Sequence, residues 1–379
     1  MVPKKRLKVG VLFGGRSGEH EISLRSALTV MSAMDPKRYE VVPIGIGRDG
    51  RWHLEHDALK VLAEKTPHLA ALSAGGPPVT ILPHPNRHAL VAAPARGDAG
   101  LRRSLDVIFP VLHGTYGEDG TVQGLLDLAG LPYVGSGMLG SAVGMDKDVQ
   151  KRLLRDAGIP VVEYFTIQRA DFRERPAIAA RMAGKLGYPV FVKPAALGSS
   201  IGISRVKRAA DLKAALDDAF QYDRKALIEA ACEGRELECA VLGNERPDAS
   251  VVGEIIVKGR HEFYSYESKY VDPTGSEVKI PANIPRAASE KIRAIAVAAF
   301  KALELRGMAR VDFLATRDLR EIYLNEVNTI PGFTAISMYP KLWEATGIPL
   351  PKLIDRLIAL AVEEHRARAA LKITYQPKK

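Results

Sequence analysis

The first 140 residues alternate short apolar runs with helix-like segments, and this alternation limits the fold more than any other feature of the sequence. Apolar runs occur at 7–13, 39–47 and 105–114, and each is closed by glycine or proline. A helix is expected at 24–34, and a loop at 117–120 is expected to open another. Parallel strands need crossover connections of this kind, usually helices. The pattern therefore predicts a parallel sheet with crossover helices.

Other segments differ from this pattern. Residues 66–104 are rich in proline, alanine, glycine and histidine, and they are predicted to form a loose hairpin or surface insertion without chemistry of its own. Residues 131–137 are predicted to form one more short strand. From about Gly140 the character of the sequence changes, and the runs at 235–244 and 249–259 are typical of antiparallel strands.

A chain of 379 residues is too long for one simple core and should form two or three domains. The predicted fold class combines α/β and α+β parts. We place the domains at 1–140, 141–230 and 231–379. The polar segment 258–285 has little apolar periodicity and is predicted to be a loop that lies over a site.

Composition excludes several classes of protein. The net charge is +10, but the basic residues are scattered, with clusters only at 4–6 and 378–379, and neither an aromatic stacking platform nor zinc-finger spacing accompanies them. A nucleic-acid-binding protein stays open as an unfavoured alternative. No apolar run could span a bilayer, and the start of the chain does not resemble a secretory signal. Cys232 and Cys239 cannot build a disulfide framework, so we expect a cytoplasmic protein.

A strand pair near the C-terminus carries the clearest chemistry. Strands are predicted at 310–315 and 321–328 with a short turn between them, which places Asp312 near Glu326 and Asn328 across the ladder. Two carboxylates and an amide supply the hard oxygen ligands that Mg²⁺ prefers, and a cation relieves the repulsion between the carboxylates. The alternative is a surface ion pair between Asp312 and a nearby arginine, Arg310 or Arg317. Arg310 itself could stabilise a developing oxyanion or form only a salt bridge.

Lys193 and two glutamates suggest a nucleotide. Lys193 ends an apolar strand and is followed by "GSSIG", where small residues allow backbone N–H groups to approach phosphate oxygens. A plain hairpin turn is the alternative, and the spacing is not that of a Walker motif. Glu229 and Glu236 could accept hydrogen bonds from an adenine amino group and from ribose hydroxyls, with the backbone at Ala231 and Cys232 against the base. Exposed glutamates without such a role are also common.

Taken together, these segments resemble the ATP-grasp ligases, and more closely the D-alanine–D-alanine ligase family. The resemblance covers nearly the whole chain in the expected order. The matching blocks are "FGGRSGEHEISL" (13–24), "HGTYGEDGTVQGLL" (113–126), "GSAVGMDK" (140–147), "FVKPAALGSSIG" (191–202), "YSYESKYVDPTGSEVKIPANIP" (264–285), "RVDF" (310–313) and "NEVNTIPGFTAISMYP" (325–340). The resemblance implies an N-terminal parallel-sheet domain and two further domains that clasp ATP between them.

The resemblance also implies roles for individual residues. The nucleotide would be held by Lys147, Lys193, Ser200, Glu229, Ala231, Cys232, Glu236 and Lys269. Two Mg²⁺ ions, or Mn²⁺ in their place, would be held by Asp312, Glu326 and Asn328, with Glu326 bridging. The catalytic residues would be Glu19, Ser199, Tyr270, Arg310 and Gly332. The two amino acids would contact Glu19, Tyr270, Arg310, Gly332, Ser337 and Met338.

The activity implied is the ATP-dependent joining of two D-alanines through an acyl phosphate, as a step in peptidoglycan precursor synthesis. A D-alanine–D-lactate or D-alanine–D-serine ligase of the same fold stays open as an alternative. The expected partners are ATP and two D-alanine molecules, with no nucleic acid and no membrane. A homodimer is expected from the resemblance and from the frequency of symmetric dimers.

Overall fold

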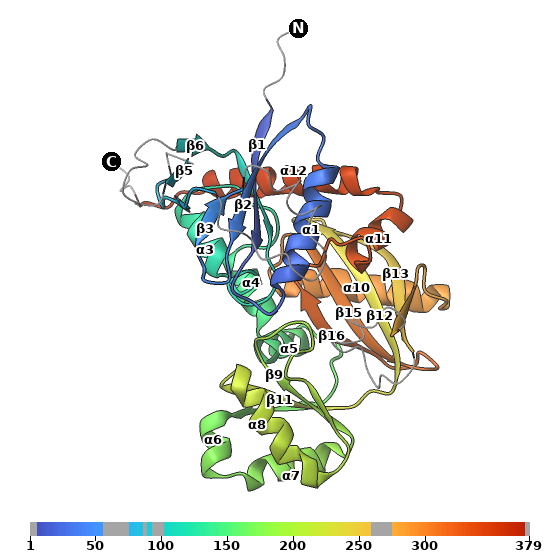
Figure 1. Ribbon diagram of the computed structural model, residues 1–379. Coiled ribbons are helices and arrows are strands. Elements are labelled where there is room, and N and C mark those ends of the chain that lie inside the picture. The colour runs from blue at the N-terminus through green and yellow to red at the C-terminus, as the bar shows by residue number, and fades with distance from the viewer. Residues whose placement is uncertain (1–5, 56–75, 86–88, 93–101, 259–274, 376–379) are drawn as a thin grey trace.

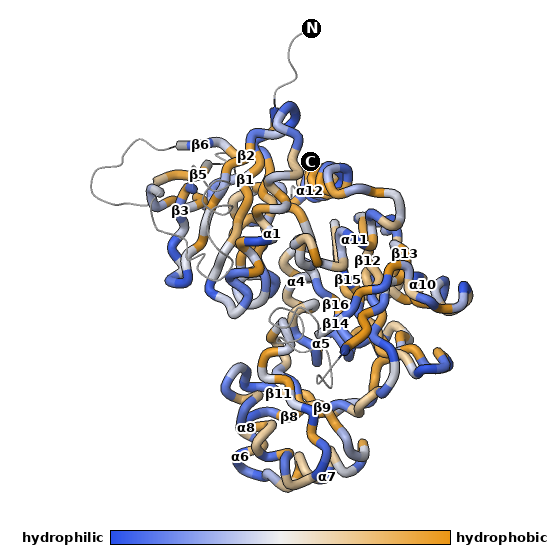
Figure 2. Tube along the Cα trace, turned by 45° about the vertical axis from the view of Figure 1, so that its right-hand side comes forward, coloured by the Kyte–Doolittle hydropathy of each residue, from blue (hydrophilic) through white to orange (hydrophobic). Residues whose placement is uncertain are grey.

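A computed structural model describes residues 6–55, 76–85, 89–92, 102–258 and 275–375. Within these residues the strands form four sheets. The chain runs from the N-terminal sheet to a lower lobe and then up to the C-terminal sheet (Figure 1). Figure 2 shows hydrophobic residues concentrated along β1 and β2 and hydrophilic residues along the outer turns. None of the described helices combines the length and the apolar character that crossing a membrane requires.

The N-terminal sheet has the strand order β3-β2-β1-β7. Its elements are β1 (Leu7–Gly14), α1 (His20–Ala33), β2 (Tyr39–Ile46), β3 (Trp52–Leu54), β7 (Val107–Val111) and α3 (Thr121–Leu128). β1 pairs in parallel with both β2 and β7, which confirms the predicted parallel sheet. Helix α1 begins at His20, four residues before the predicted start, and this places Glu19 at its N-cap.

The structure describes two further predicted segments of this region, 131–137 and part of 66–104. The strand predicted at 131–137 is wrong, because only Tyr133 forms a bridge, to Ile108, and Gly135 then turns the chain with a φ of +102°. Part of the segment 66–104 forms a small antiparallel sheet. Its strands are β4 (Val79–Ile81), β5 (Ala89–Ala92) and β6 (Arg102–Ser104).

The central sheet forms the lower lobe in Figure 1 and has the order β10-β9-β11-β8. Its elements are β8 (Tyr164–Gln168), α6 (Arg169–Glu174), α7 (Ala177–Leu186), β9 (Val190–Pro194), β10 (Ser204–Val206), a 3₁₀ turn (Ala209–Asp211), α8 (Leu212–Tyr222) and β11 (Lys225–Ala230). All its pairings are antiparallel. Apolar residues of the three helices bury its outer face in a separate core. The strand, Gly/Ser turn and strand predicted after 188 are confirmed as β9 and β10.

The C-terminal sheet has the order β14-β13-β12-β15-β16, and all of its pairings are antiparallel. Its elements are β12 (Gly234–Gly243), β13 (Asp248–Val257), β14 (Ser276–Lys279), α10 (Arg286–Ala302), β15 (Gly307–Thr316), β16 (Ile322–Asn328), α11 (Met338–Ala345) and α12 (Leu350–Ala369). Helix α10 packs against one face. Helices α11 and α12 cover the other face, and α12 also packs under the N-terminal sheet, so both sheets share one core.

Helices α4 (Met138–Met145) and α5 (Lys147–Asp156) lead from the N-terminal sheet to the central sheet, and α4 also contacts β16 of the C-terminal sheet. The side chain of Asp146 caps α5 by accepting from the N–H groups of Asp148 and Val149. The buried amide of Gln150 donates to the carbonyl of Val327 at 3.3 Å and accepts from its N–H at 3.2 Å. This reciprocal pair holds α5 against the end of β16, and it therefore fixes where Lys147 enters the space between the sheets.

Close packing of α4 generates the first prediction. A Cβ atom at Gly140 would lie 2.7 Å from the backbone oxygen of Glu304, whereas a Cβ at Gly184 of α7 would meet nothing within 4 Å. We expect Gly140→Ala to lower the unfolding free energy by about 1–3 kcal/mol, because the backbones must separate. The matched change Gly184→Ala should raise it by about 0.5–1 kcal/mol. Thermal unfolding followed by circular dichroism measures both, and equal stability of the two variants would contradict this packing.

Candidate active site

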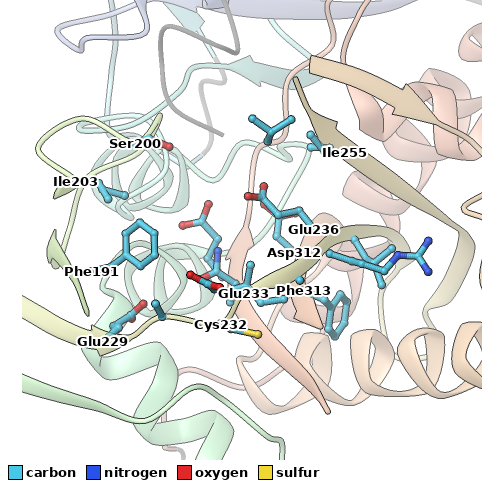
Figure 3. Close-up of a pocket in the computed structure, with 18 of the residues that line it drawn as sticks. Phe191, Ser200, Ile203, Glu229, Cys232, Glu233, Glu236, Ile255, Asp312 and Phe313 are labelled. Atoms are coloured by element: carbon cyan, nitrogen blue, oxygen red, sulfur yellow. The ribbon is translucent and has the colours of Figure 1, made fainter. Parts of the chain in front are cut away.

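A cavity of about 430 Å³ lies between the central and C-terminal sheets. Figure 3 shows Glu229 on the side of the central sheet and Glu236 and Asp312 on the other. The cavity brings together nine residues that the sequence analysis assigned to nucleotide and metal: Lys147, Lys193, Ser200, Glu229, Ala231, Cys232, Glu236, Asp312 and Glu326. Residues up to 179 positions apart in the sequence therefore line one space, as the first and last of these show.

The predicted hairpin of β15 and β16 forms one wall. Asp312 pairs in register with Glu326, and Arg310 pairs with Asn328. The next pair is Phe313 with Leu324, so β16 carries one extra residue at this point, a β-bulge. The bulge lets Asn325 and Glu326, although adjacent, both line the cavity. The predicted proximity of Asp312, Glu326 and Asn328 is thus confirmed.

The charges on this wall are partly compensated. The Asn328 amide donates to Asp312 at 3.0 Å, and Arg310 donates to both oxygens of Asp312 at 2.7 Å. The alternative of an ion pair between Asp312 and an arginine is therefore realised with Arg310. It forms in the cavity wall and not on the surface, because the Asp312 side chain is only 13% exposed.

Arg310 also pairs with an acid that the sequence analysis missed. Glu238 lies opposite Asp312 on β12, is 4% exposed, and has a carboxylate oxygen 3.0 Å from Arg310 Nε. Burial lowers the pKa of Arg310, but the two carboxylates outweigh it and raise the pKa well above its usual value. Arg310 is thus a fixed, permanently charged group between two acids.

The donor set at the hairpin fits a hard divalent cation. In the described part of the chain, no group of three His, Cys, Asp or Glu side chains is arranged to hold a metal ion unaided. Asp312 and Glu326 supply two carboxylates at paired positions, and Asn328 adds an amide beside them. Mg²⁺ is commonly held by one or two carboxylates together with water and substrate phosphates. These three residues fit that requirement when a phosphorylated ligand completes the coordination.

Two lysines enter the cavity from different elements. Lys147 donates to the carbonyl of Leu197 at 2.6 Å and lies 3.6 Å from a Glu326 oxygen. Lys193 lies 2.6 Å from Glu229 and donates to the Asn325 side chain at 3.2 Å. Burial lowers the pKa of Lys193, but Glu229 outweighs it, and the net shift is upward. Both ammonium groups are therefore placed to meet phosphate oxygens.

Glu229, predicted to accept from an adenine amino group, lines the cavity and pairs there with two lysines. It is 1% exposed, and its two oxygens lie 2.6 Å from Lys193 and 3.2 Å from Lys151. Burial raises its pKa, but the two lysines outweigh this and lower the pKa to about 2. Its carboxylate is thus the counter-ion of two lysines. Lys151 was missed, although its position one helical turn after Lys147 was a usable signal.

A second cluster forms where the N-terminal sheet faces the Gly/Ser turn. Ser199 donates a hydrogen bond to Glu19, and a Cβ at Gly198 would come within 2.7 Å of the Glu19 carboxylate. Ser199 and Ser200 have φ values of +52° and +58°, a left-handed conformation that serine rarely adopts. The structure thus brings together Glu19 and Ser199, which come from different domains in the predicted division.

The turn that carries Gly332 is held by residues of the N-terminal unit. His113 Nδ1 lies 3.0 Å from the carbonyl oxygen of Ile330, and Glu118 accepts from the N–H of Ile330 at 2.9 Å. Glu118 also accepts from the N–H of Gly114 at 2.8 Å, and burial, reinforced by Glu19, raises its pKa to about 8. His113 and Glu118 lie within a block quoted above, but their partners could not be read from the sequence.

The remaining predicted residues divide into three groups. Gly332 and Ser337 lie together, since a Cβ at Gly332 would be 2.8 Å from Ser337 Oγ. The side chain of Met338 is buried in the core and would lie 2.5 Å from a Cβ at Gly253, so only its backbone is left for the predicted contact with substrate, which stays a prediction. Lys269 and Tyr270 lie outside the described residues.

The lowered pKa of Glu229 predicts a dependence of stability on pH. Its folded-state pKa is about 2 against an ordinary value of 4.5, so its charge favours the folded state above pH 4.5, and this contribution is lost as the pH falls toward 2. The shift corresponds to roughly 3 kcal/mol. We expect Glu229→Gln to lower the unfolding free energy by about that amount near neutral pH and by less than half of it near pH 3. Urea unfolding at both pH values measures the difference, and a constant gap between the two proteins would contradict the ion pairs.

Comparison with known proteins identifies the family. Residues 8–136 match the family described as D-ala D-ala ligase N-terminus, and residues 153–359 match D-ala D-ala ligase C-terminus. The chain is 50% identical over 366 residues to D-alanine–D-alanine ligase A of Chromobacterium violaceum, covering 97% of this chain and 98% of the relative.

Two solved structures are similar over nearly the whole chain. The D-alanine–D-alanine ligase of Coxiella burnetii has a TM-score of 0.81 and 39% identity, over 96% of this chain and 97% of that one. The VanG D-Ala:D-Ser ligase of Enterococcus faecalis has a TM-score of 0.82 and 36% identity, over 94% and 100%. These likenesses confirm the predicted ATP-grasp fold. The chain belongs to the D-alanine–D-alanine ligase family.

Proposed function

We propose that this chain uses ATP to join two D-alanine molecules into D-alanyl-D-alanine, a step of peptidoglycan precursor synthesis, in the cytoplasm and as a homodimer. One observation supports the activity above the others. The acidic hairpin and the two lysines line one cavity, Glu19 and Ser199 form a second cluster, and Glu118, on which Glu19 acts, holds Ile330 two residues before Gly332. The first arrangement suits a nucleotide, and the second suits small zwitterionic substrates.

In this proposal ATP lies in the cavity between the two antiparallel sheets. Lys147 and Lys193 bind its phosphates, Glu236 the ribose hydroxyls, and the backbone at Ala231 and Cys232 the edge of the base. Glu229 acts through Lys193 and does not contact the base. Asp312, Glu326 and Asn328 would hold two Mg²⁺ ions. Bound there, the ions would neutralise negative charge on the phosphoryl group that is transferred.

The amino acids bind beside the phosphates. The Glu19 carboxylate accepts the ammonium of the first D-alanine, whose carboxylate takes the γ-phosphoryl group and becomes an acyl phosphate. The amine of the second D-alanine, held near Ser337, attacks this carbonyl, and phosphate leaves. Arg310 and the N–H of Gly332 stabilise the oxyanion of the tetrahedral species. Arg310 pairs with Asn328 across the hairpin, and Gly332 follows Asn328 by four residues, so both donors belong to the same end of the hairpin.

Resemblance assigns one task each to Lys269 and Tyr270. Lys269 contacts the γ-phosphate, and Tyr270 shields the reacting groups from water, because an exposed acyl phosphate would hydrolyse. A second acceptor, D-serine, deserves a direct test, since a D-Ala:D-Ser ligase is among the similar structures. D-lactate is the third candidate, because it presents a hydroxyl in place of the amine.

The proposed reaction can be tested with the purified protein. We expect ATP, Mg²⁺ and D-alanine together to give phosphate and D-alanyl-D-alanine in equal amounts, measured by a phosphate assay and by mass spectrometry. Parallel reactions contain D-alanine with D-serine or with D-lactate in equal concentration. A product mixture dominated by the mixed dipeptide or by the depsipeptide at neutral pH would overturn the assignment of the acceptor.

A change at the hairpin tests the metal site. Glu326→Gln keeps the shape of the side chain but removes a bridging charge, and we expect phosphate release to fall roughly 10²-fold or more. Glu245→Gln, at an exposed glutamate in the turn between β12 and β13, is the matched control and should keep wild-type turnover. Wild-type turnover by Glu326→Gln would remove the metal-binding role.

A further inference from the structure

A buried lysine lies behind the cavity and is not used by the reaction described above. Lys151 follows Lys147 by one turn of α5, and its relative exposure is 0%. It is not among the residues that line the cavity. Its Nζ lies 3.2 Å from one Glu229 oxygen, and the other oxygen of Glu229 lies 2.6 Å from Nζ of Lys193. Glu229 thus joins a lysine that faces the cavity to one that does not.

The three groups carry two positive charges and one negative charge. Without Lys151, the charge of Glu229 would cancel the charge of Lys193. The pair of Glu229 and Lys193 would then attract a polyphosphate only weakly. The carboxylates of Glu326 and Glu236 also act on Lys193, and they further reduce the positive potential that it presents to the cavity. With Lys151 present, Glu229 is balanced from behind, and the group keeps a net charge of one positive unit.

Two contacts favour the charged form of Lys151 against the cost of its burial, the ion pair with Glu229 and an aromatic ring. The ring of Tyr164 lies 5.9 Å from its Nζ, and Arg155 stacks on the same ring at 4.6 Å. Burial lowers the pKa of Lys151 and outweighs the opposing effect of Glu229, so the net shift is downward, and the ion pair with Glu229 at 3.2 Å is the contact that favours the charged amine. A fully buried lysine is costly, and a packed apolar residue pair at such a position is often no less stable. A role in function would explain why this position carries a charge.

We propose that Lys151 is a positioning residue for the nucleotide: it neutralises Glu229, so that Lys193 presents an uncompensated positive charge to the phosphates. The inference rests on the proposed function in that the cavity accepts ATP. It predicts that nucleotide affinity follows the net charge of Lys151, Glu229 and Lys193 and not the presence of any one side chain behind the cavity.

The test is a calorimetric titration of the full-length protein with ADP and Mg²⁺. We expect Lys151→Met, with net charge zero, to weaken ADP binding roughly tenfold or more. The double variant Lys151→Met/Glu229→Gln restores the net charge and should bind ADP within about threefold of the wild type. Lys185→Met, which removes an exposed lysine from α7, is the matched control and should leave the affinity unchanged.

A purely structural role gives a different result. It predicts that the double variant, even when melting curves show it to be folded, binds ADP as weakly as Lys151→Met, and this outcome would overturn the proposal. Wild-type affinity in Lys151→Met, or no ADP binding by the wild type, would do the same. If Lys151→Met does not fold, Glu229→Gln alone decides, because the proposal predicts ADP affinity equal to or above that of the wild type.

The same measurement separates this inference from the proposed function. ADP binding requires neither D-alanine nor turnover. A protein that shows the expected dependence on charge but forms no dipeptide would contradict the proposed function and leave the inference intact. A protein that forms the dipeptide, but whose ADP affinity does not depend on the net charge of the three residues, would support the proposed function and contradict the inference.

Discussion

The attachment of α5 to β16 through the Gln150 amide is the constraint on which the geometry of the cavity depends. β16 belongs to the C-terminal sheet, and α5 leads into the central sheet, so this buried contact relates the two walls. It sets Lys147 beside Glu326, and it sets Lys151 behind Glu229. A buried amide that makes both of its hydrogen bonds is specific in direction, because leaving either group unpaired is costly. Apolar packing alone would allow α5 to slide.

Charges in the cavity wall are arranged in alternating order. Arg310 separates Asp312 from Glu238, and Glu229 separates Lys193 from Lys151. Each arrangement carries one unit of net charge, negative around Arg310 on β12 and β15 and positive at the lysines. A magnesium nucleotide has the complementary distribution, with a cation to be held by the acids and phosphates to be held by the lysines. Most of the cost of burying these charged side chains is thus offset within each group of three, and the one unpaired charge of each group is available to bind ligand.

Much of the fold could be predicted because its signals are local. Apolar runs closed by glycine or proline indicated β1 and β2, and alternation before a short turn indicated the β15–β16 hairpin, whose bulge at Asn325 the sequence did not predict. The predicted strand at 131–137 failed because a single glycine conformation ended the pairing after Tyr133. That the side chain of Met338 is buried could not be predicted, because the sequence does not show which face of α11 packs on the core.

The candidate site was less accessible to sequence reasoning wherever a partner is distant in the chain. Glu229 was interpreted by itself, whereas its environment is created by lysines on α5 and β9. Glu238, Lys151 and Glu118 were missed for the same reason. Each is an ordinary charged residue in its local sequence, and only the tertiary contacts give it a task. Glu19 and Ser199 were assigned by resemblance, and the structure shows a hydrogen bond between them, from the turn after β9 to the N-cap of α1.

The position of α12 has a consequence for biosynthesis. The face of the N-terminal sheet that carries Val9 and Val11 is covered by the last helix of the chain as well as by α1. A ribosome releases the beginning of this protein long before it finishes the end. The strand β1 therefore stays partly uncovered until α12 has emerged, whereas the central lobe, which has a separate core, can fold as soon as its own residues have emerged.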